Sequence, residues 1–381
     1  MAQIKKIGDQ TKPEYIIEVY DNKIGMEGFL VIDNTVLGPG KGGIRMTSDV
    51  TVEEVARLAK IMTWKNALAG IPFGGAKAGI KWKGGSNNLK KQFIQSFARA
   101  IKPFLLKKYI AAPDINTGEK EMQWFVEATG MFRSATGKPA NICMEYKKCK
   151  KCGIPHEFGS TGFGVVQAAK VAAKIIGLDI KNATVSIHGF GNVGTFAYKF
   201  LTEMGAKVVA LADKNTSIYL KDSLEEEIIK KLIKNKKDLS HYSGKAKKIK
   251  PEDFWKIPVD IMIPASVTDV INDNNKKYIK AKIIVEAANI PMEERVEDEL
   301  LSKGILIVPD CIANAGGVIS SYSEHCGHNI KKMFNTVEKK IKKTTEIVLQ
   351  ESLRKKRNPR HIAMEIAKKK IQTNANKKSR V

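Results

Sequence analysis

The stretch ATVSIHGFGNVGTFAYKFLTEMGAKVVALAD, residues 183–213, decides the fold of this chain. It begins with a short β-branched strand pattern, turns through glycines into a helix pattern, and ends in a second short apolar run. Three later runs, VDIMIPAS, KIIVEAA and ILIVPD, have the same β-branched character, which is typical of strands buried in a parallel sheet. Strands that alternate with helices in this order predict an α/β fold built on an open, mostly parallel sheet.

The glycine turn has the spacing GxGxxG and lies directly between the strand pattern and the helix pattern. Glycines permit a tight turn and a close approach of the backbone to a ligand, and the N-terminus of the helix offers free N–H groups and a partial positive charge to a pyrophosphate. An acidic residue ends the next strand, where its carboxylate can accept hydrogen bonds from a ribose 2′-hydroxyl. This combination predicts a Rossmann-type dinucleotide site at Gly189, Phe190, Gly191, Asn192, Val193, Gly194, Asp213 and Lys214.

Residues 213–216 leave the choice of dinucleotide open. Asp213 favours NAD, because a carboxylate suits a free ribose 2′-hydroxyl. Lys214 beside it could instead contact the 2′-phosphate of NADP, although Asn215 and Thr216 add no further positive charge. The sequence is therefore compatible with NAD or NADP.

Chain length and composition indicate a two-domain protein of the cytoplasm. A chain of 381 residues exceeds the size at which single cores usually stop growing. No apolar run approaches the ~20 residues that span a bilayer, and the first ten residues lack the apolar stretch of a signal peptide. The five cysteines are odd in number and three of them crowd one segment, unlike a secreted disulfide framework. We therefore expect a soluble cytoplasmic protein without a membrane partner.

The chain is strongly basic, with 65 Lys and Arg against 40 Asp and Glu, a formal net charge of +25. A surplus of this size attracts polyanions such as nucleic acid. The lysines are nevertheless spread through the chain and lack the interleaved aromatic residues of a single-strand binder. A solvated, lysine-rich surface is the favoured interpretation, and nucleic acid is not an expected partner.

The region before residue 156 has a mixed strand and helix pattern. GMEGFLVIDN alternates like a strand, and residues 51–69 have helical periodicity, with Thr51 and Glu54 at the spacing of a capping box. Lys65 continues the apolar stripe of this helix at its end. At the other end of the chain, the pattern predicts two helices broken near Asn358-Pro359.

Three lysines of the first region stand in unusual surroundings: Lys41 in GPGKGGIRM, Lys65 in MTWKNALAG and Lys77 in PFGGAKAG. Neighbouring glycines let a backbone approach a ligand closely. A lysine that is desolvated among apolar groups and other cations has a lowered pKa, so it can act in acid–base chemistry near neutral pH. Three such lysines indicate a pocket for an anionic substrate with a reactive centre.

A series of motifs runs through nearly the whole chain: KGGIRM, TWKNALAGIPFGGAKAG, IAAPDINTGEKEMQWF, GSTGFGV, GFGNVG, VDIMIPAS, VEAANIP and PDCIANAGGVISSYSE. In this order they resemble the glutamate, leucine, phenylalanine and valine dehydrogenases, which oxidatively deaminate amino acids with a nicotinamide cofactor. The chain is most similar to a glutamate dehydrogenase. The resemblance implies a homo-oligomer whose small-molecule partners are an amino acid and its 2-oxo acid.

The resemblance also implies a domain arrangement. Residues 1–156 would form a mixed α/β domain that binds substrate and makes oligomer contacts. Residues 157–325 would form the Rossmann-type domain. Residues 326–381 would form a helical segment that packs back toward the cleft between the domains.

Positions that match the family's motifs carry expected roles. Lys65 matches the lysine that holds the substrate α-carboxylate, and Lys77 matches the catalytic lysine that activates the water attacking the imine. Asp114 matches the aspartate that transfers protons, although its place before TGEKEMQWF is equally compatible with a turn or helix cap. Asn289 matches an asparagine near the nicotinamide ribose, and Asn314 lies in the NAGG turn on the cofactor side.

The identity of the amino acid depends on Lys41 and Ser321. In glutamate dehydrogenases a lysine and a serine at these positions bind the side-chain carboxylate, and Gly42 and Gly43 adjoin this lysine in the substrate-binding motif. Burial of a second carboxylate without a cation is costly, so Lys41 favours glutamate on physical grounds as well. If Lys41 faces solvent instead, a branched-chain or aromatic amino-acid dehydrogenase is the alternative. A non-catalytic, basic relative that binds nucleic acid is an alternative of another class.

The segment ICMEYKKCKKCGIPHE is an insertion relative to the family. Cys149 and Cys152 form a CxxC pair, and together with Cys143 and His156 they could supply four ligands to a structural zinc ion. A redox pair is the alternative. The segment is short and lysine-rich and no second CxxC follows, which argues against a metal.

Overall fold

The computed structural model describes residues 12–146, 149–155 and 158–378. The chain divides into two compact units. Unit 1 contains Met1–His156, Val318–Met333 and Ile366–Val381, and unit 2 contains Glu157–Gly317 and Phe334–Glu365. Each unit has its own sheet with helices packed on it, which confirms the expected two-domain α/β fold.

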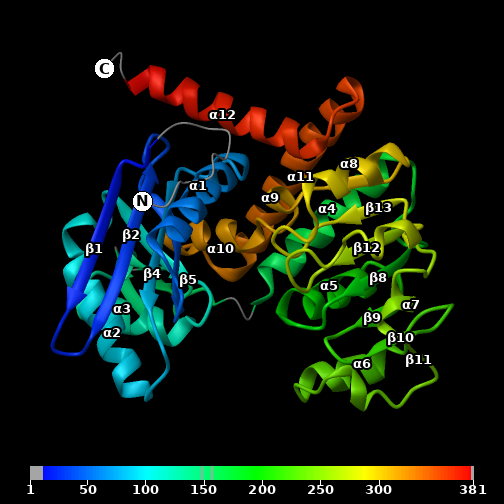
Figure 1. Cartoon of the computed structure of the whole chain (residues 1–381), viewed down its shortest axis with the longest axis horizontal. Helices are drawn as coiled ribbons and strands as arrows, with labels where there is room; N and C mark the ends of the chain where they lie inside the picture. The colour runs from blue at the N-terminus through cyan, green and yellow to red at the C-terminus, as the bar shows by residue number, and fades with distance from the viewer. Residues whose placement is uncertain (1–11, 147–148, 156–157, 379–381) are drawn as a thin grey trace. The chain divides into compact units, whose positions relative to one another are not determined.

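Unit 1 is built on a five-stranded mixed sheet (Figure 1). Its strands are β1 (Tyr15–Asp21), β2 (Met26–Asn34), β3 (Gly40–Thr47), β4 (Gly74–Lys81) and β5 (Tyr109–Pro113). They lie in the order β1-β2-β4-β3-β5, with β2 antiparallel to β1 and β4, and β3 parallel to β4 and β5. This order places β3 between β4 and β5, so residues after these strands can meet at one edge.

Helices cover both faces of this sheet. The other elements before the insertion are α1 (Val52–Leu68), α2 (Asn87–Ala100), η1 (Lys102–Phe104), α3 (Glu119–Thr129) and η2 (Phe132–Ser134). On β2, Phe29 and Val31 are buried in one cluster with α1 residues, whereas Leu30 and Ile32 belong to the cluster that contains α2 and α3 residues. Alternate residues of the strand thus face opposite layers, because successive side chains of a strand point to opposite faces.

Unit 2 is built on a seven-stranded sheet in the order β11-β10-β9-β8-β12-β13-β14, most of which is labelled in Figure 1. The strands are β8 (Thr184–His188), β9 (Lys207–Ala212), β10 (Ser217–Tyr219), β11 (Lys247–Ile249), β12 (Ile261–Pro264), β13 (Ile283–Val285) and β14 (Leu306–Val308). The run from β9 to β14 is parallel, and β10 and β11 add antiparallel strands at one side. The parallel sheet predicted from the β-branched runs is therefore confirmed.

The helices of unit 2 lie before, between and after its strands, and α5 directly follows the glycine turn. In chain order they are α4 (Ser160–Ile175), α5 (Asn192–Glu203), α6 (Glu226–Lys234), η4 (Leu239–His241), α7 (Pro251–Phe254), η5 (Lys276–Tyr278), α8 (Glu294–Ser302) and α9 (Asp310–Ala313). The C-terminal part contains α10 (Gly316–His325), α11 (Ile330–Lys355) and α12 (Pro359–Lys378). The break between the last two helices falls at Asn358-Pro359 as predicted, because proline suits the first helical position and not the interior.

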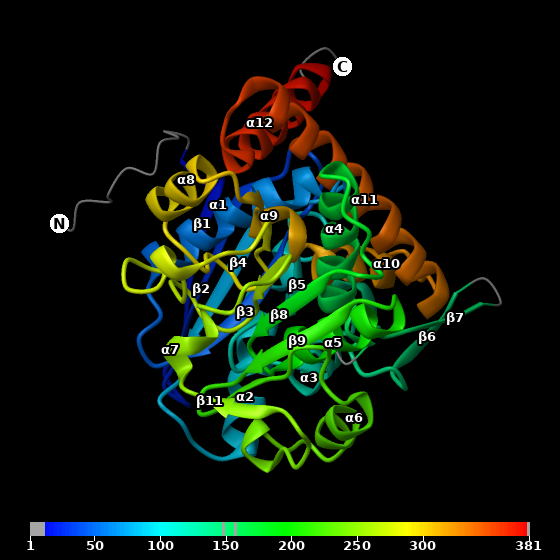
Figure 2. The ribbon, with the colours of Figure 1, turned by 90° about the vertical axis from the view of Figure 1, so that its right-hand side faces the viewer.

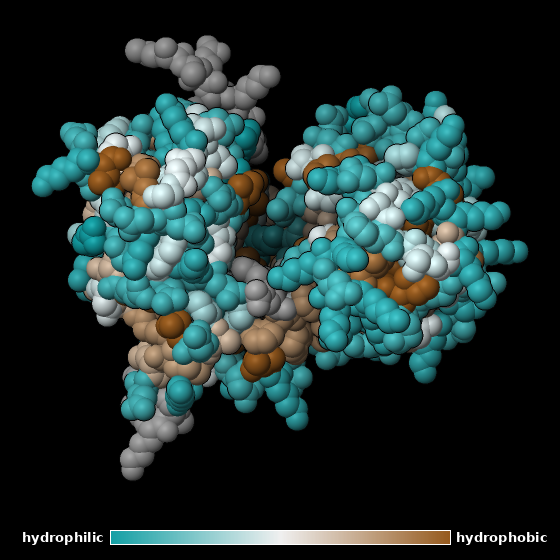
Figure 3. All heavy atoms as spheres, turned by 90° about the horizontal axis from the view of Figure 1, so that it is seen from below, coloured by the Kyte–Doolittle hydropathy of each residue, from teal (hydrophilic) through white to brown (hydrophobic). Residues whose placement is uncertain are grey.

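One face of the molecule is predominantly hydrophilic. On the face seen in Figure 3, hydrophilic side chains cover most of the area and the hydrophobic ones form separate small patches. Within the residues that the structure describes, no helix combines the length and hydropathy needed to cross a membrane. The high content of lysine is consistent with the solvated surface expected from the sequence.

A buried charge cluster fixes the start of α12 within unit 2. The guanidinium of Arg360 donates to Glu286 at 2.6 Å, to Glu297 at 2.6 Å and to Asp310 at 2.7 Å. Glu286 and Glu297 are almost fully buried, so this guanidinium is their main compensating charge. Removal of one member of a buried ion cluster is costly because it leaves the other charges desolvated and unpaired.

Arg360→Met should therefore lower the free energy of unfolding by about 3–5 kcal/mol, as is usual when a buried pair loses one partner. Urea denaturation followed by circular dichroism measures this loss. Arg357→Met is the matched control, because Arg357 is about half exposed and pairs with Glu365 at the surface, where pairs contribute about 1 kcal/mol or less. Equal losses in both variants would contradict a structural role for the cluster.

Candidate functional site

Unit 1 brings Lys77 and Asp114 into direct contact. Lys77 lies in β4 and Asp114 follows β5, and the Nζ atom of Lys77 is 2.8 Å from Oδ2 of Asp114. Arg45, in the intervening strand β3, donates from Nε to the same oxygen at 3.1 Å. Two of the predicted catalytic residues therefore form one ion pair, and Asp114 is not merely a turn or cap residue.

The pKa values of this pair suit proton transfer. Burial lowers the pKa of Lys77, and the Asp114 carboxylate offsets this effect only in part. Burial alone would raise the pKa of Asp114, but the ammonium of Lys77 and the guanidinium of Arg45 outweigh it and hold the pKa below its usual value. The site therefore contains an ionised carboxylate next to an amine that gives up its proton more readily than usual.

Lys41 lies in the interior of unit 1, with 1% of its surface exposed. Its Nζ atom donates to the carbonyl oxygen of Ala111 at 2.7 Å. Burial holds its pKa well below the usual value, Glu324 acts in the opposite direction, and Lys138 and Lys77 lower it further. The alternative of a solvated loop lysine is therefore wrong for Lys41.

The other predicted substrate residues occupy the same unit. Lys65 lies in the last turn of α1 and is partly exposed. Ser321 is buried on α10, one helical turn before His325, whose pKa burial lowers to about 4, with further lowering by Arg133 and Lys41. Residues four positions apart share a helix face, so Ser321 and His325 lie on one face of α10.

The two predicted substrate glycines lie in β3 and are buried. The carbonyl oxygen of Gly42 accepts a hydrogen bond from the hydroxyl of Tyr109 at 3.0 Å. A Cβ atom on Gly43 would lie 2.6 Å from the carbonyl oxygen of Pro113 and 2.7 Å from Cβ of Asp114. Only glycine at position 43 therefore allows the backbone that carries Asp114 to pack this closely against β3.

A second buried ion pair lies beside Lys41 and was not anticipated from the sequence. Lys138 contacts Glu324 at 2.5 Å, and both side chains are about 1% exposed. The other oxygen of Glu324 accepts hydrogen bonds from the backbone N–H of Gly137 at 2.7 Å and of Ile154 at 2.9 Å. Lys138 and Glu324 stand in the stretches TGKPAN and SSYSE, but nothing in their local pattern indicates a pair separated by 186 residues.

Unit 2 assembles the predicted dinucleotide residues at the carboxyl ends of its parallel strands. Gly189 follows β8, and Gly191 is the N-cap of α5. A Cβ atom on Gly194 would lie 1.9 Å from the carbonyl oxygen of Gly189, so the third glycine is required for the helix to pack against the turn. The strand order reverses between β8 and β12, which is where dinucleotides bind in such sheets. Phe190, Asn192 and Val193 complete this turn and the first turn of the helix.

Asp213 follows β9 and uses its carboxylate to shape the following turn. Oδ1 accepts hydrogen bonds from the backbone N–H of Asn215 and Thr216, both at 2.8 Å, and Oδ2 accepts one from Leu239 at 2.7 Å. Lys214, beside it, is exposed. The two residues expected to distinguish NAD from NADP thus differ in setting, since the Asp213 carboxylate is held by backbone N–H groups and the Lys214 side chain is exposed to solvent.

The two predicted asparagines lie together. The side-chain amide of Asn314 donates to Oδ1 of Asn289 at 3.0 Å and also contacts the carbonyl oxygens of Ala287 and Ala288 at 3.3 Å. Asn314 is buried and Asn289 is exposed. The turn after β13 is therefore held by one asparagine while the other reaches the surface.

The structure corrects the prediction of a zinc site. The insertion forms a two-stranded hairpin of β6 (Cys143–Tyr146) and β7 (Cys149–Cys152), seen in Figure 2. Cys143 pairs with Cys152 across the hairpin, with Cα atoms 4.0 Å apart, and their sulfurs form a disulfide. Two of the four expected ligands are therefore consumed, whereas His156 and the side chain of Cys149 lie outside the described residues. Among the side chains that are described, no group of three His, Cys, Asp or Glu could hold a metal ion.

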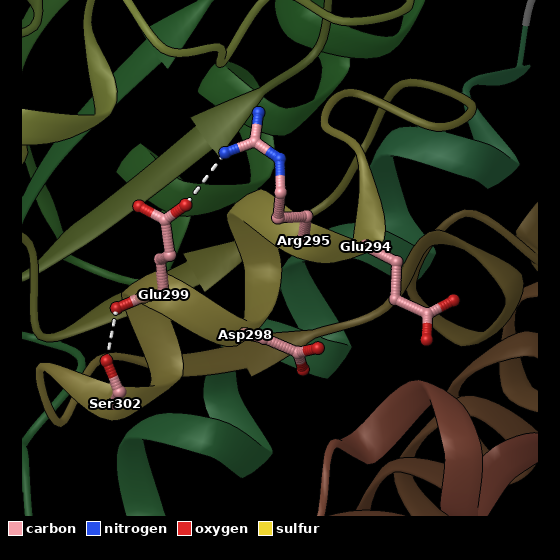
Figure 4. Close-up of a pocket in the computed structure, with 5 residues that line it drawn as sticks. All are labelled: Glu294, Arg295, Asp298, Glu299 and Ser302. Carbon is pink, nitrogen blue, oxygen red and sulfur yellow. Dashed lines mark hydrogen bonds and ion pairs between the residues drawn. The ribbon is translucent and has the colours of Figure 1, made fainter.

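A concave surface on α8, drawn in Figure 4, is lined by none of the predicted site residues. It is lined by Glu294, Arg295, Asp298, Glu299 and Ser302. The guanidinium of Arg295 already donates to Glu299 at 2.8 Å and to Asp273 at 2.7 Å. These are exposed ion pairs on a helix surface, so we assign no ligand to this concavity.

Comparison with known proteins agrees with this geometry. Residues 152–379 match the sequence model of the Glutamate/Leucine/Phenylalanine/Valine dehydrogenase family, and residues 13–131 match the model described as Glu/Leu/Phe/Val dehydrogenase, dimerisation domain. The chain is 35% identical to a glutamate dehydrogenase of Aeropyrum pernix over 334 residues, which cover 83% of this chain and 77% of the relative. It is 37% identical to an NADP-specific glutamate dehydrogenase of Saccharolobus shibatae over 331 residues, or 82% and 76% of the two chains. The crystal structure of glutamate dehydrogenase from Peptoniphilus asaccharolyticus is similar with a TM-score of 0.82 at 28% identity, covering 97% of this chain and 92% of that one.

The disulfide predicts a specific pattern of thiol reactivity. Alkylation of the denatured, unreduced protein should leave Cys143 and Cys152 unlabelled and label Cys311 and Cys326, whose thiols are not in a disulfide. After reduction, Cys143 and Cys152 should be labelled as well. Peptide mass spectrometry distinguishes these cases. Labelling of Cys143 before reduction, together with stoichiometric zinc in the purified protein, would contradict the disulfide.

Proposed function

Because the chain belongs to the glutamate/leucine/phenylalanine/valine dehydrogenase family, we propose that it oxidatively deaminates L-glutamate to 2-oxoglutarate and ammonium, with NAD or NADP as the hydride acceptor. The observation that carries this proposal is the Lys77–Asp114 ion pair in the same unit as the buried cation of Lys41. The pair supplies proton transfer, and the additional cation supplies a partner for a second carboxylate.

Recognition of glutamate is assigned to three side chains of unit 1. Lys65 binds the α-carboxylate, and Lys41 and Ser321 bind the side-chain carboxylate. The burial of Lys41 supports this assignment, since its desolvated ammonium donates to a neutral carbonyl oxygen and therefore gains from an anionic ligand. An apolar substrate side chain would leave this ammonium without a counter-charge, which disfavours the branched-chain and aromatic alternatives.

Proton transfer is assigned to Asp114 and Lys77. A hydride can leave the substrate Cα only when the amino nitrogen has a free electron pair, so the α-ammonium must first lose a proton. Asp114, held ionised by its two cationic neighbours, accepts that proton. Asp114 then releases this proton to solvent and is ionised again. Lys77 orients and polarises the water that adds to the imine carbon, and Asp114 accepts the proton of this water. Asp114 returns that proton to the amino nitrogen, so that the C–N bond can break and the hydroxyl proton leaves with the nitrogen as ammonium.

The residues of unit 2 fit a nicotinamide dinucleotide. The glycines of the turn bring the backbone close to a pyrophosphate, and the first turn of α5 offers its N–H groups. Asn289 and Asn314 are assigned to the nicotinamide ribose side, and Asp213 and Lys214 to the adenosine ribose side. When bound, the nicotinamide accepts the hydride from the substrate Cα. We assign the preference between NAD and NADP to the balance between Asp213 and Lys214.

We also propose that the enzyme is a homo-oligomer. The match of residues 13–131 to a model described as a dimerisation domain supports this proposal. Strand β1 forms the edge of the unit 1 sheet and exposes Ile16 and Tyr20 by 54% and 60%. An exposed edge strand with apolar side chains is suited to pairing with another chain.

Turnover of glutamate tests the proposed reaction. The purified protein should reduce NAD or NADP with glutamate, and more slowly or not at all with leucine, valine or phenylalanine. Lys77→Ala should lower kcat by about 10²–10⁴-fold, the usual contribution of a positioned acid–base group, while dinucleotide binding measured by calorimetry stays unchanged. Absence of turnover with every amino acid, together with tight and salt-sensitive binding of nucleic acid, would favour the non-catalytic alternative.

Exchange of Lys41 tests the choice of substrate. Lys41→Leu removes the buried cation, so kcat/KM for glutamate should fall by about two orders of magnitude or more, because a carboxylate would be buried without its partner. The rate with leucine or norvaline should not fall in parallel. Lys81→Leu is the control, because Lys81 lies in the same sheet, is 39% exposed and pairs with Glu27 at 2.8 Å. Equal losses on glutamate and leucine would count against side-chain recognition by Lys41.

A further inference from the structure

Asp114 is held by two cations through a single oxygen atom. Both Nζ of Lys77 and Nε of Arg45 contact Oδ2, at 2.8 and 3.1 Å. Among the described residues, no contact of the other oxygen, Oδ1, is recorded, and the side chain retains 21% of its exposure. Since one oxygen is clamped and the other is accessible, the carboxylate presents Oδ1 for proton transfer.

The two cations differ in chemistry. The pKa of Lys77 is lowered, so its amine can lose its proton, and with it its charge, more readily than an ordinary lysine. A guanidinium keeps its proton at every accessible pH and holds its donors in a fixed fork. Arg45 is therefore the permanent charge at Asp114, whereas Lys77 is the variable one.

Glu54 occupies the other side of the Arg45 guanidinium. Nη1 of Arg45 contacts Oε1 of Glu54, and both side chains are largely buried. Thr51 accepts a hydrogen bond from the backbone N–H of Glu54 at 3.2 Å, as the predicted capping box requires. The Glu54 carboxylate, however, contacts Arg45 instead of the backbone N–H of Thr51. The carboxylate is thus used for the Arg45 contact and not for the reciprocal half of the helix cap.

The backbone around Asp114 is fixed independently of Arg45. The hydroxyl of Thr117 donates to the carbonyl oxygen of Ile44 at 2.6 Å and accepts from the N–H of Asp114 at 2.9 Å. The side-chain amide of Asn116 donates to the carbonyl oxygen of Met46 at 3.1 Å. These contacts tie the turn after β5 to β3 without the Arg45 side chain. Loss of Arg45 should therefore alter the carboxylate and not unfold the turn.

We propose that Arg45 is a positioning residue for the proposed glutamate oxidation: it clamps Oδ2 of Asp114, turns Oδ1 toward the substrate, and together with Glu54 sets the pH range in which Asp114 works as a base. This inference rests on the proposed function, in which Asp114 takes up protons. Arg45 itself does not contact the reacting atoms; it acts through Asp114.

The direction of the expected pH effects follows from the charges that face Asp114. Burial raises the pKa of Asp114, and Lys77 and Arg45 lower it. Glu54 faces Arg45 from α1, and Tyr109 on β5 is a neutral neighbour whose pKa burial raises further above its usual value. Loss of Arg45 leaves only Lys77 against burial, so the pKa of Asp114 should rise. Loss of the Glu54 charge leaves Arg45 less neutralised, so the pKa of Asp114 should fall.

Beyond these groups, Lys90 on α2 lies near the same turn. Its Nζ atom contacts Asn116 at 3.2 Å and Glu121 at 2.9 Å. This ion pair is unchanged in every variant below, so it contributes equally to each profile.

The test compares the pH dependence of kcat/KM for glutamate in Arg45→Gln and Glu54→Gln. Asp114 must be ionised to accept a proton, so activity falls below its pKa. The acidic limb should move to higher pH in Arg45→Gln and to lower pH in Glu54→Gln, each by on the order of one pH unit, as for a charge within about 4–6 Å. Arg45→Lys keeps the charge but not the fork, so it should lower kcat while moving the limb less than Arg45→Gln does.

The matched controls are Glu53→Gln and Lys81→Gln. Glu53 adjoins Glu54 in the first turn of α1 and is exposed, and Lys81 is a strand cation of the same sheet that pairs with Glu27. Both should retain the profile of the unmodified enzyme. Circular dichroism and the unfolding midpoint verify folding, and if Arg45→Gln does not fold, the shift in Glu54→Gln decides. Shifts in the same direction, or no shift in Glu54→Gln, overturn the inference.

The inference and the proposed function can fail separately. If the unmodified protein does not oxidise glutamate, the function is wrong, and the pKa of Asp114 is then read from its ¹³C carboxyl resonance, identified by its loss in Asp114→Asn. Opposite shifts of this resonance in the two variants would support control by Arg45 and Glu54 without any turnover. If glutamate is oxidised and the limbs do not move, the function stands and the role of Arg45 is wrong.

Discussion

A lysine ammonium that is buried in the protein interior needs an oxygen within hydrogen-bond distance, and this requirement links distant segments of unit 1. Lys41 meets the carbonyl oxygen of Ala111, Lys77 meets Asp114, and Lys138 meets Glu324. Each oxygen comes from a segment far from its lysine in the sequence, so each contact ties two parts of the unit together. Burial of these charges without their partners would cost several kcal/mol per ion.

Such contacts are nevertheless a poor way to stabilise a fold. A buried ion pair seldom contributes more than well-packed apolar side chains of similar volume would. Lysines in three buried positions of one unit are therefore better explained by a functional role than by stability. Groups with perturbed pKa values concentrate at sites that transfer protons or bind anionic ligands. The residue types support this distinction. At Lys41 the hydrogen-bond partner is a neutral carbonyl oxygen, and Glu324 acts on its charge without a direct contact, whereas at Lys138 the partner is a carboxylate held by two backbone N–H groups. The first arrangement suits a ligand, and the second suits a fixed support.

The sequence could predict those features that depend on local pattern. The β-branched runs gave the parallel strands of unit 2, and the glycine spacing placed Gly189 and Gly194 at the turn where the backbone packs most closely. Glycine and alanine neighbours correctly indicated that Lys41 and Lys77 are buried.

The pairing of Lys138 with Glu324 could not be predicted, because it depends on two segments 186 residues apart. Glu54 was assigned only to a helix cap, since its local spacing fits one and its contact with Arg45 depends on how α1 packs on the sheet. The cysteines were considered as zinc ligands because CxxC spacing fits a metal, whereas the register that places Cys143 opposite Cys152 is a property of the folded hairpin.

The two units differ in how their buried charges are compensated. In unit 1, the buried Lys41 donates to a carbonyl oxygen and not to a carboxylate, so its positive charge remains available to a ligand. In unit 2, three carboxylates converge on the single guanidinium of Arg360, and two of them are also tied to the backbone beside the predicted nicotinamide side. Asp310 accepts from the N–H of Ile290, next to Asn289, and Glu286 accepts from the N–H of Asp310. The arginine thus supports a backbone turn, and its charge is fully used there. The charge of Lys41 thus lies where an anionic substrate is proposed to bind. The charge of Arg360 is neutralised by carboxylates in the unit whose proposed ligand is recognised mainly by backbone and amide groups.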